Sequence, residues 1–219
     1  MSRVVFVTDI DTSLGNQLVS LFLESGDRVF ATTTNQDALS SFDKVAGDSL
    51  RVFPWIRRSP VSVRNVTLKA LTAFDAIDVL VQLGPPDLGN VPLLQAEAAD
   101  IEEEIDSWVK GSLFLSRELL AYFARRRTGL AALVSQNSPH GGGVLGEIAR
   151  ASFRGLVDAL LRTTGAAAES VCVNAFESTS SNTEDYAAFV HRALDEKAKR
   201  VSGKLFRHPG GLLATLKRR

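Results

Sequence analysis

Residues 4–15 read VVFVTDIDTSLG, and this stretch decides the fold. Its first part, Val4–Thr8, is a short β-branched run of the kind that forms a fully buried strand in a parallel sheet. Apolar residues at helical spacing follow at once, beginning at Leu14 and continuing to Ser25, and Gly26 ends the helix. A buried strand that leads directly into an amphipathic helix is typical of α/β proteins.

The same alternation continues along the chain, and no hairpin signal interrupts it. Further strands are predicted at 28–32, 50–55, 77–83, 130–135 and 170–176, and further helices at 37–46, 61–73, 102–127, 147–164 and 183–199. Because strand–helix–strand crossovers are right-handed, this order predicts a doubly wound, Rossmann-like parallel sheet with helices on both faces. Such sheets bind ligands beyond the carboxyl ends of their strands.

Length and composition are those of one globular domain, expected to span residues 1–219 with a C-terminal extension from about residue 200. A single cysteine, Cys172, excludes an internal disulfide framework. The chain lacks an apolar run of roughly 18 residues and a signal-peptide pattern at its start, so we expect a cytoplasmic protein without a membrane partner. The 25 basic and 25 acidic residues cancel, which argues against nucleic acid as a partner.

Charge is nevertheless uneven along the chain. Residues 190–219 carry nine lysines and arginines against Asp195 and Glu196, so this segment is +7 and the remainder −7. The segment is either a solvated helix with a basic tail or a patch for an acidic partner.

Several segments resemble, in order and spacing, the short-chain dehydrogenase/reductase family. TDIDTSLG at 8–15 stands where the family has T-G-x-x-x-G-[IL]-G, and DVLVQLG at 78–84 where it has D-x-L-V-N-N-A-G. LVSQNS at 133–138 resembles the strand that ends in the catalytic serine, and ARASFRGL at 149–156 the helix that carries the catalytic lysine. The resemblance covers nearly the whole chain.

This resemblance implies a nicotinamide dinucleotide and hydride transfer. By position, the cofactor-binding candidates are Thr8, Asp9, Ser13, Leu14, Gly15, Thr33 and Gly84. Family members use a tyrosine as general acid/base, a lysine four residues later, a serine that steadies the substrate oxygen, and an asparagine on the central helix. Helices 102–127 and 147–164 would pair across a two-fold axis, so the resemblance also implies a homodimer or homotetramer.

The catalytic set is largely missing from this sequence. Neither tyrosine has a lysine four residues later, and the aligned helix has Gly146 at the tyrosine position and Arg150 at the lysine position. Glycine has no proton to give, and arginine is effectively never deprotonated. The asparagine position falls on Trp108, and the serine position on Ser138, or on Ser135 in a shifted register.

The catalytic candidates that remain are Ser138, Arg150 and His140. The imidazole of His140 titrates near neutral pH and is either an acid/base or an ordinary loop histidine beside a glycine run. Two other histidines, His191 and His208, lie in the polar C-terminal region and are expected to be solvated. The histidines and the cysteine are too scattered for a metal site.

The cofactor loop has lost two of its three glycines, which Asp9 and Ser13 replace, and only Gly15 remains. Asp9 either directs a carboxylate at the diphosphate position, which opposes binding, or caps the helix. Arg57 and Arg58 follow the third strand, where they either reach a phosphate or are solvated. We therefore expect no cofactor, or weak NAD(P) binding.

These losses favour a homologue that keeps the fold but has lost hydride transfer, and that acts by binding a ligand or a protein partner. The alternative is a divergent NAD(P)-dependent oxidoreductase that acts on a small carbonyl or alcohol substrate. An enzyme of another class on the same scaffold is the third possibility, because fold does not determine function. Candidate dimer-interface or core residues on the two long helices are Leu113, Leu120, Phe123, Phe153, Leu156 and Leu160.

Overall fold

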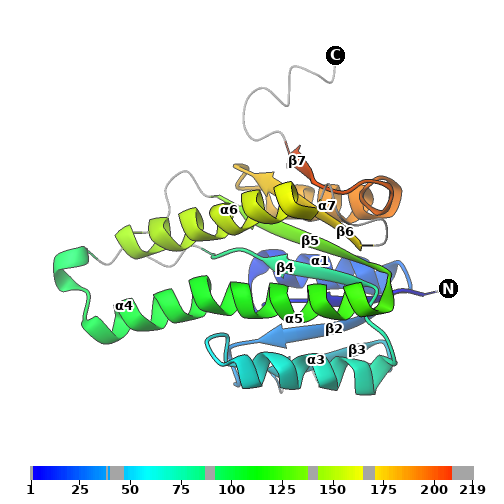
Figure 1. The fold of residues 1–219 in the computed structure, drawn as a ribbon, viewed down its shortest axis with the longest axis horizontal. Coiled ribbons are helices and arrows are strands. Elements are labelled where there is room, and N and C mark those ends of the chain that lie inside the picture. The colour runs from blue at the N-terminus through cyan, green and yellow to red at the C-terminus, as the bar shows by residue number, and fades with distance from the viewer. Residues whose placement is uncertain are drawn as a thin grey trace, which may run out of the picture.

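The computed structural model describes residues 2–37, 39, 47–86, 92–137, 143–164 and 171–208. Seven strands form one sheet in the order β3-β2-β1-β4-β5-β6-β7, and every neighbouring pair is parallel (Figure 1). The strands are β1 Val4–Val7, β2 Arg28–Thr33, β3 Leu50–Pro54, β4 Val79–Leu83, β5 Gly129–Gln136, β6 Val171–Ser178 and β7 Lys204–His208. The predicted doubly wound α/β fold is thereby confirmed.

Helices cover both faces of this sheet. The main helices are α1 Ser13–Glu24, α3 Pro60–Phe74, α4 Ala98–Glu104, α5 Gly111–Arg126, α6 Val144–Thr164 and α7 Thr183–Glu196. Figure 1 shows α3, α5 and α6 in front of the sheet, and α1 behind it. Two short helices, η1 Leu93–Gln95 and η3 Ala198–Arg200, also lie among the described residues.

Alternate residues of each strand supply two separate cores. Val5 and Val7 of β1 pack with α1 and α7, whereas Val4 and Phe6 pack with α3 and α5. This division follows from the two-residue period of a strand, and a strand buried on both faces has to be apolar throughout. The run VVFV meets that requirement, since all four of its side chains are buried.

Most predicted elements agree with the structure to within a few residues, but the long helix predicted at 102–127 is built differently. It consists of α4, a π-helical turn η2 at Ile105–Lys110, and α5, which together run without a break from residue 98 to 126. The π-helical turn holds Trp108, whose side chain is buried. Such turns are rare and frequently mark functional positions. Most of the helix predicted at 37–46 lies outside the described residues.

A seventh strand was not predicted. Lys204–His208, within the segment assigned to a C-terminal extension, pairs in parallel with β6 and forms the sheet edge. Its sequence KLFRH lacks a continuous apolar run because an edge strand is only partly buried. Two expectations for nearby histidines were wrong. His208 is buried against Tyr186 and Phe189, and His191 is half-buried beside Phe22.

Within the described part of the chain, no helix is both long enough and apolar enough to cross a membrane. Cys172 is half-exposed, and its thiol donates to the carbonyl oxygen of Lys199.

Candidate functional site

The turn between β1 and α1 is tight and lies at the carboxyl edge of the sheet. Thr12 caps α1, since its hydroxyl accepts a hydrogen bond from the Gly15 N–H at 3.0 Å and donates one to the Asp9 carbonyl at 2.7 Å. Gly15 has no room for a side chain, because a Cβ would overlap that same carbonyl. Asp9 itself has a φ of 56°, in the left-handed region that favours glycine. The turn therefore keeps the backbone path of a glycine-rich loop although its first glycine is absent.

The Asp9 carboxylate is buried and forms an ion pair with the guanidinium of Arg57, which is buried as well. The Arg57 guanidinium also lies over the ring of Trp108, 3.7 Å from its centroid, and 4.9 Å from that of Trp55. The alternative that Asp9 caps the helix was wrong, because Thr12 is the cap, whereas its effect on a bound phosphate stays a prediction. Of the two alternatives for Arg57, the solvated one was wrong, because its side chain is buried.

Burial sets the electrostatics of this pair. Loss of solvent raises the pKa of the Asp9 carboxyl, and Arg57 opposes that shift. Loss of solvent likewise lowers the pKa of Arg57, against the attraction of Asp9. Each charge is thus stabilised by the other, because a buried ion without a partner is costly.

An acidic cavity of about 300 Å³ lies next to this pair, outside the ends of β1 and β2. Its charged lining residues are Asp9, Asp11, Glu103, Glu104 and Arg57. Asp9 already neutralises Arg57, and the neighbouring Arg58 is exposed and pairs with Glu103. The phosphate groups of a dinucleotide would be repelled by the carboxylates here, so these residues do not fit the adenosine half of NADP.

The other predicted cofactor residues divide into two groups. The hydroxyls of Thr8 and Thr33 accept hydrogen bonds from the backbone N–H groups of Leu83 and Asn35, at 2.9 and 3.0 Å. Ser13, Leu14 and Gly84 line a second space, the central cavity, of about 300 Å³ between α1 and the ends of β4 and β5. With Asp9 and Gly15 in the turn, all seven predicted cofactor residues therefore lie near the carboxyl ends of the strands.

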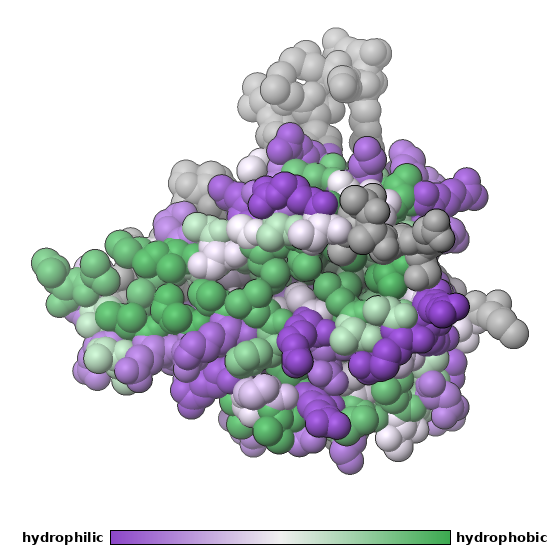
Figure 2. Space-filling model, viewed as in Figure 1, coloured by the Kyte–Doolittle hydropathy of each residue, from purple (hydrophilic) through white to green (hydrophobic). Residues whose placement is uncertain are grey.

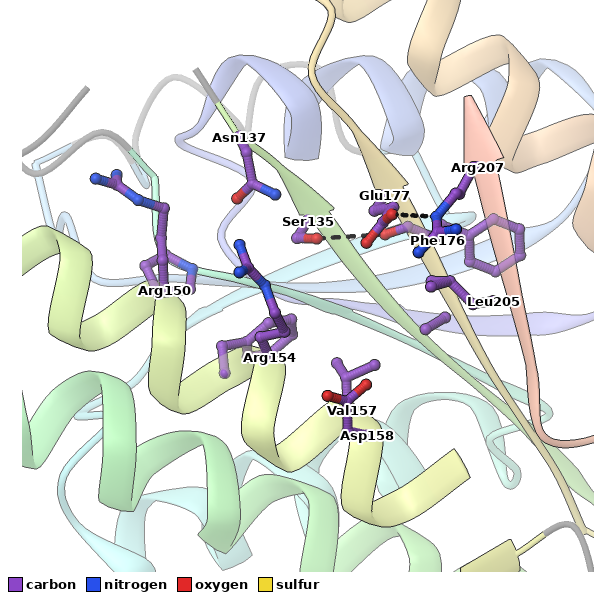
Figure 3. A pocket seen from close by; sticks show the side chains of 13 residues that line it. Ser135, Asn137, Arg150, Arg154, Val157, Asp158, Phe176, Glu177, Leu205 and Arg207 are labelled. Carbon is purple, nitrogen blue, oxygen red and sulfur yellow. Dashed lines mark hydrogen bonds and ion pairs between the residues drawn. The ribbon is translucent and has the colours of Figure 1, made fainter. Parts of the chain in front are cut away.

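A third space, the α6 cavity, lies between α6 and strands β5, β6 and β7 and has a volume of about 180 Å³. Figure 3 shows Ser135 and Asn137 of the β5 end on one side and Arg150 and Arg154 of α6 on the other. The buried Arg150 donates a hydrogen bond to Glu147 at 2.8 Å, and its guanidinium turns away from that of Arg154 (Figure 3).

The catalytic candidates are only partly described. Ser138 and His140 lie outside the described residues, so their prediction stays open. Ser135, the shifted-register alternative, lines the α6 cavity together with Arg150. Gly146, which the sequence aligns with the tyrosine position, lies in the first turn of α6.

The hydroxyls of the two tyrosines are hydrogen-bonded to the backbone. The hydroxyl of Tyr186 donates to the carbonyl of Ser135 at 3.0 Å, and burial raises the pKa of this phenol well above its usual value. The hydroxyl of Tyr122 accepts a hydrogen bond from the N–H of Ile77, just before β4 begins and thus at the amino ends of the strands. Both hydroxyls are therefore committed to structure.

Sequence reasoning missed the roles of three residues. Arg57 was not linked to Asp9, although a carboxylate predicted in a buried turn requires a cation beside it. Asn137 and Arg154 were not singled out, and only the pairing of β5 with α6 brings them to one cavity.

No family model matches the sequence. Curated relatives include the NADP-dependent 3-hydroxy acid dehydrogenases YdfG of Shigella flexneri and Escherichia coli (strain K12). Each is 26% identical over 126 residues, which is 58% of this chain and 51% of the relative. The matched region thus spans about half the length of these relatives.

Solved structures match over almost the whole chain. A short chain dehydrogenase from Bacillus anthracis has a TM-score of 0.83 at 15% identity, with 95% of each chain covered. A putative 3-oxoacyl-reductase from Bacillus thuringiensis has a TM-score of 0.76 at 16% identity, with 97% of this chain and 98% of that chain covered. At these identities the structures show the fold. The fold is thus that of solved structures named as a short chain dehydrogenase and a putative 3-oxoacyl-reductase.

Proposed function

We propose that this chain is a short-chain dehydrogenase/reductase homologue that has lost hydride transfer and acts by binding a ligand or a partner. The observation that carries the proposal is the Asp9–Arg57 pair, stacked on Trp108 at the dinucleotide edge of the sheet. An internal carboxylate takes the cation that a cofactor phosphate would otherwise use. The Asp9 carboxylate therefore neutralises Arg57 in place of a cofactor phosphate.

The chemistry of the catalytic helix supports the same reading. Gly146 and Arg150 supply no acid/base group at the positions of the tyrosine and lysine, and the Trp108 indole at the asparagine position can donate a hydrogen bond but cannot accept one. Arg150 offers fixed positive charge, which can bind an anion but cannot transfer a proton. The site therefore favours binding over proton-coupled chemistry.

The second candidate is a divergent NADP-dependent oxidoreductase, and the curated relatives, which are named NADP-dependent dehydrogenases, favour it. The central cavity also leaves room beside Ser13 and Gly84. In this reading Ser138 and His140 would supply the acid/base chemistry that α6 lacks. The acidic cavity speaks against it, since the NADP 2′-phosphate would face carboxylates.

A second copy of the chain is the partner that the surface supports best. Figure 2 shows an apolar region over α5 and the start of α6. Leu113, Val144 and Ile148 are exposed there, whereas Phe123 and Phe153, two of the predicted interface-or-core residues, are buried in the core. Exposed apolar side chains that lie together on two helices favour self-association, and we propose a homodimer through this face, with a homotetramer as the higher form.

Direct titration with NADPH and NADH tests the loss of cofactor binding. The expected result is no binding by calorimetry up to millimolar concentration. Replacing Asp9→Gly and Ser13→Gly together should create measurable NADPH affinity, because the first change frees Arg57 and the second opens the turn. The matched control is Asp75→Gly, since Asp75 also has a left-handed φ, of 64°, but ends α3 on the surface.

Two results would count against the proposal. Micromolar NADPH binding by the unaltered chain would favour the oxidoreductase reading and would call for a screen of carbonyl substrates. Failure of the double variant to gain affinity, in a protein that still folds, would show that Asp9 and Ser13 do not block the cofactor.

A further inference from the structure

The α6 cavity has a polar end formed by side chains of α6 and of the end of β5. Arg154 and Asn137 both line it, and Figure 3 shows the guanidinium of one and the amide of the other pointing toward each other, with Ser135 beside them. Among the described residues, neither the Arg154 guanidinium nor the Asn137 side-chain amide forms a hydrogen bond or an ion pair. A guanidinium and a side-chain amide that line one hollow can together supply N–H donors to an anion.

The two other arginines around the cavity form ion pairs with carboxylates, and an aspartate adds negative charge. Arg207 donates to the carboxylate of Glu177 at 2.5 Å, and Arg150 pairs with Glu147. Asp158 lies one turn beyond Arg154 on the same helix and also lines the cavity. Its negative charge weakens the attraction for an anion but leaves the N–H groups of the Arg154 guanidinium in place.

The wall below this polar end is apolar. Phe153 and Val157 of α6 and Leu205 of β7 form it, and the first two are buried. A volume of about 180 Å³ admits a small molecule and is too small for a dinucleotide. The hollow therefore combines a planar, bidentate anion donor with a short apolar wall.

We propose that the α6 cavity binds a small aliphatic carboxylate, with its carboxylate on Arg154 and Asn137 and its chain against Phe153, Val157 and Leu205. A carboxylate is favoured over a phosphate because it is planar, like the guanidinium and the amide, and because it can carry an alkyl chain that packs on the apolar wall. This inference rests on the proposed function, since it names the ligand that a protein without hydride transfer would hold.

Sodium hexanoate is the probe, titrated by calorimetry and by ligand-observed NMR. Hexanamide, which has the same chain without the charge, should bind at least roughly tenfold more weakly, and so should inorganic phosphate, which has the charge without the chain. Equal binding of hexanoate and hexanamide would overturn the assignment of the polar end. Equal binding of hexanoate and phosphate would overturn the assignment of the apolar wall.

Variants on the exposed side of α6 test the residues while sparing the core. Arg154→Gln should weaken hexanoate binding roughly tenfold, and Asp158→Asn should tighten it several-fold. Arg162→Gln is the matched control, because Arg162 is an exposed arginine on the same helix that does not line the cavity. Unchanged affinity in Arg154→Gln, with the same thermal unfolding as the control, would contradict the proposal.

The same titration, repeated with NADPH present, separates the two proposals. Hexanoate binding that requires NADPH would leave the cavity assignment standing and overturn the loss of cofactor function. Absence of hexanoate binding in either condition, together with absence of NADPH binding, would overturn the cavity assignment alone.

Discussion

The acidic cavity and the α6 cavity lie along the same carboxyl edge of one sheet, yet they treat charge in opposite ways. At the ends of β1–β3 the arginines are paired, Arg57 with Asp9 and Arg58 with Glu103. At the end of β5, Arg154 and Asn137 have no partner among the described residues. Among the described residues, this edge of the sheet thus carries neutralised cations beside the acidic cavity and an unpaired cation beside the α6 cavity.

The first test breaks the paired region and should give the largest effect. Arg57→Met leaves the Asp9 carboxylate buried without a cation, which should lower the free energy of unfolding by about 3–5 kcal/mol. Urea unfolding followed by circular dichroism measures it.

The double variant Asp9→Gly with Arg57→Met is the control, because it removes both charges and relieves the left-handed backbone of Asp9. It should recover most of the lost stability. A single variant that costs less than about 1 kcal/mol would mean that Asp9 finds water or another cation.

The second test concerns the strand that walls the α6 cavity. The buried amide of Asn174 donates to the carbonyls of Ala198 and Val201, both at 2.8 Å, and accepts from the N–H of Lys204 at 3.0 Å. Asn174→Ala leaves these buried groups without partners and should cost roughly 3 kcal/mol. Hydrogen exchange should show faster exchange at β7 than at β1.

Since β7 carries Leu205, the same Asn174→Ala variant should also weaken hexanoate binding. Uniform acceleration of exchange across the sheet would instead indicate global destabilisation, and Asn174 would then not act specifically on β7.

The third test concerns the turn that holds Asp9. Gly15→Ala forces a Cβ into the Asp9 carbonyl and should cost about 2 kcal/mol in thermal or urea unfolding. Gly155→Ala is the matched control, because a Cβ there meets no atom within 4 Å on an exposed helix position. The control should stabilise the protein by about 0.5–1 kcal/mol. Equal effects of the two changes would show that the turn adapts.

The sequence predicts the sheet well because buried parallel strands must be apolar on both faces, as in VVFV at residues 4–7. It does not predict β7, whose KLFRH pattern reflects a half-exposed edge. The position of Gly15 in the turn between β1 and α1 is predictable, but the helix cap formed by Thr12 was not predicted. The Asp9–Arg57 pair is not, because the partners are 48 residues apart and meet only when β3 pairs with β2 beside β1.

The smallest effect is expected for the neighbour of Arg57. Arg58 and Glu103 are each about half-exposed (51% and 52% for the side chains), so water screens their ion pair, and Arg58→Met should change stability by at most about 0.5–1 kcal/mol. Arg57 and Arg58 are adjacent, pair with carboxylates in the same way, and differ in burial. Comparing the two methionine variants in one urea series therefore isolates what burial adds. Similar losses of stability for both variants would mean that the Asp9–Arg57 pair is hydrated. That result would contradict the proposal that this pair excludes a cofactor phosphate.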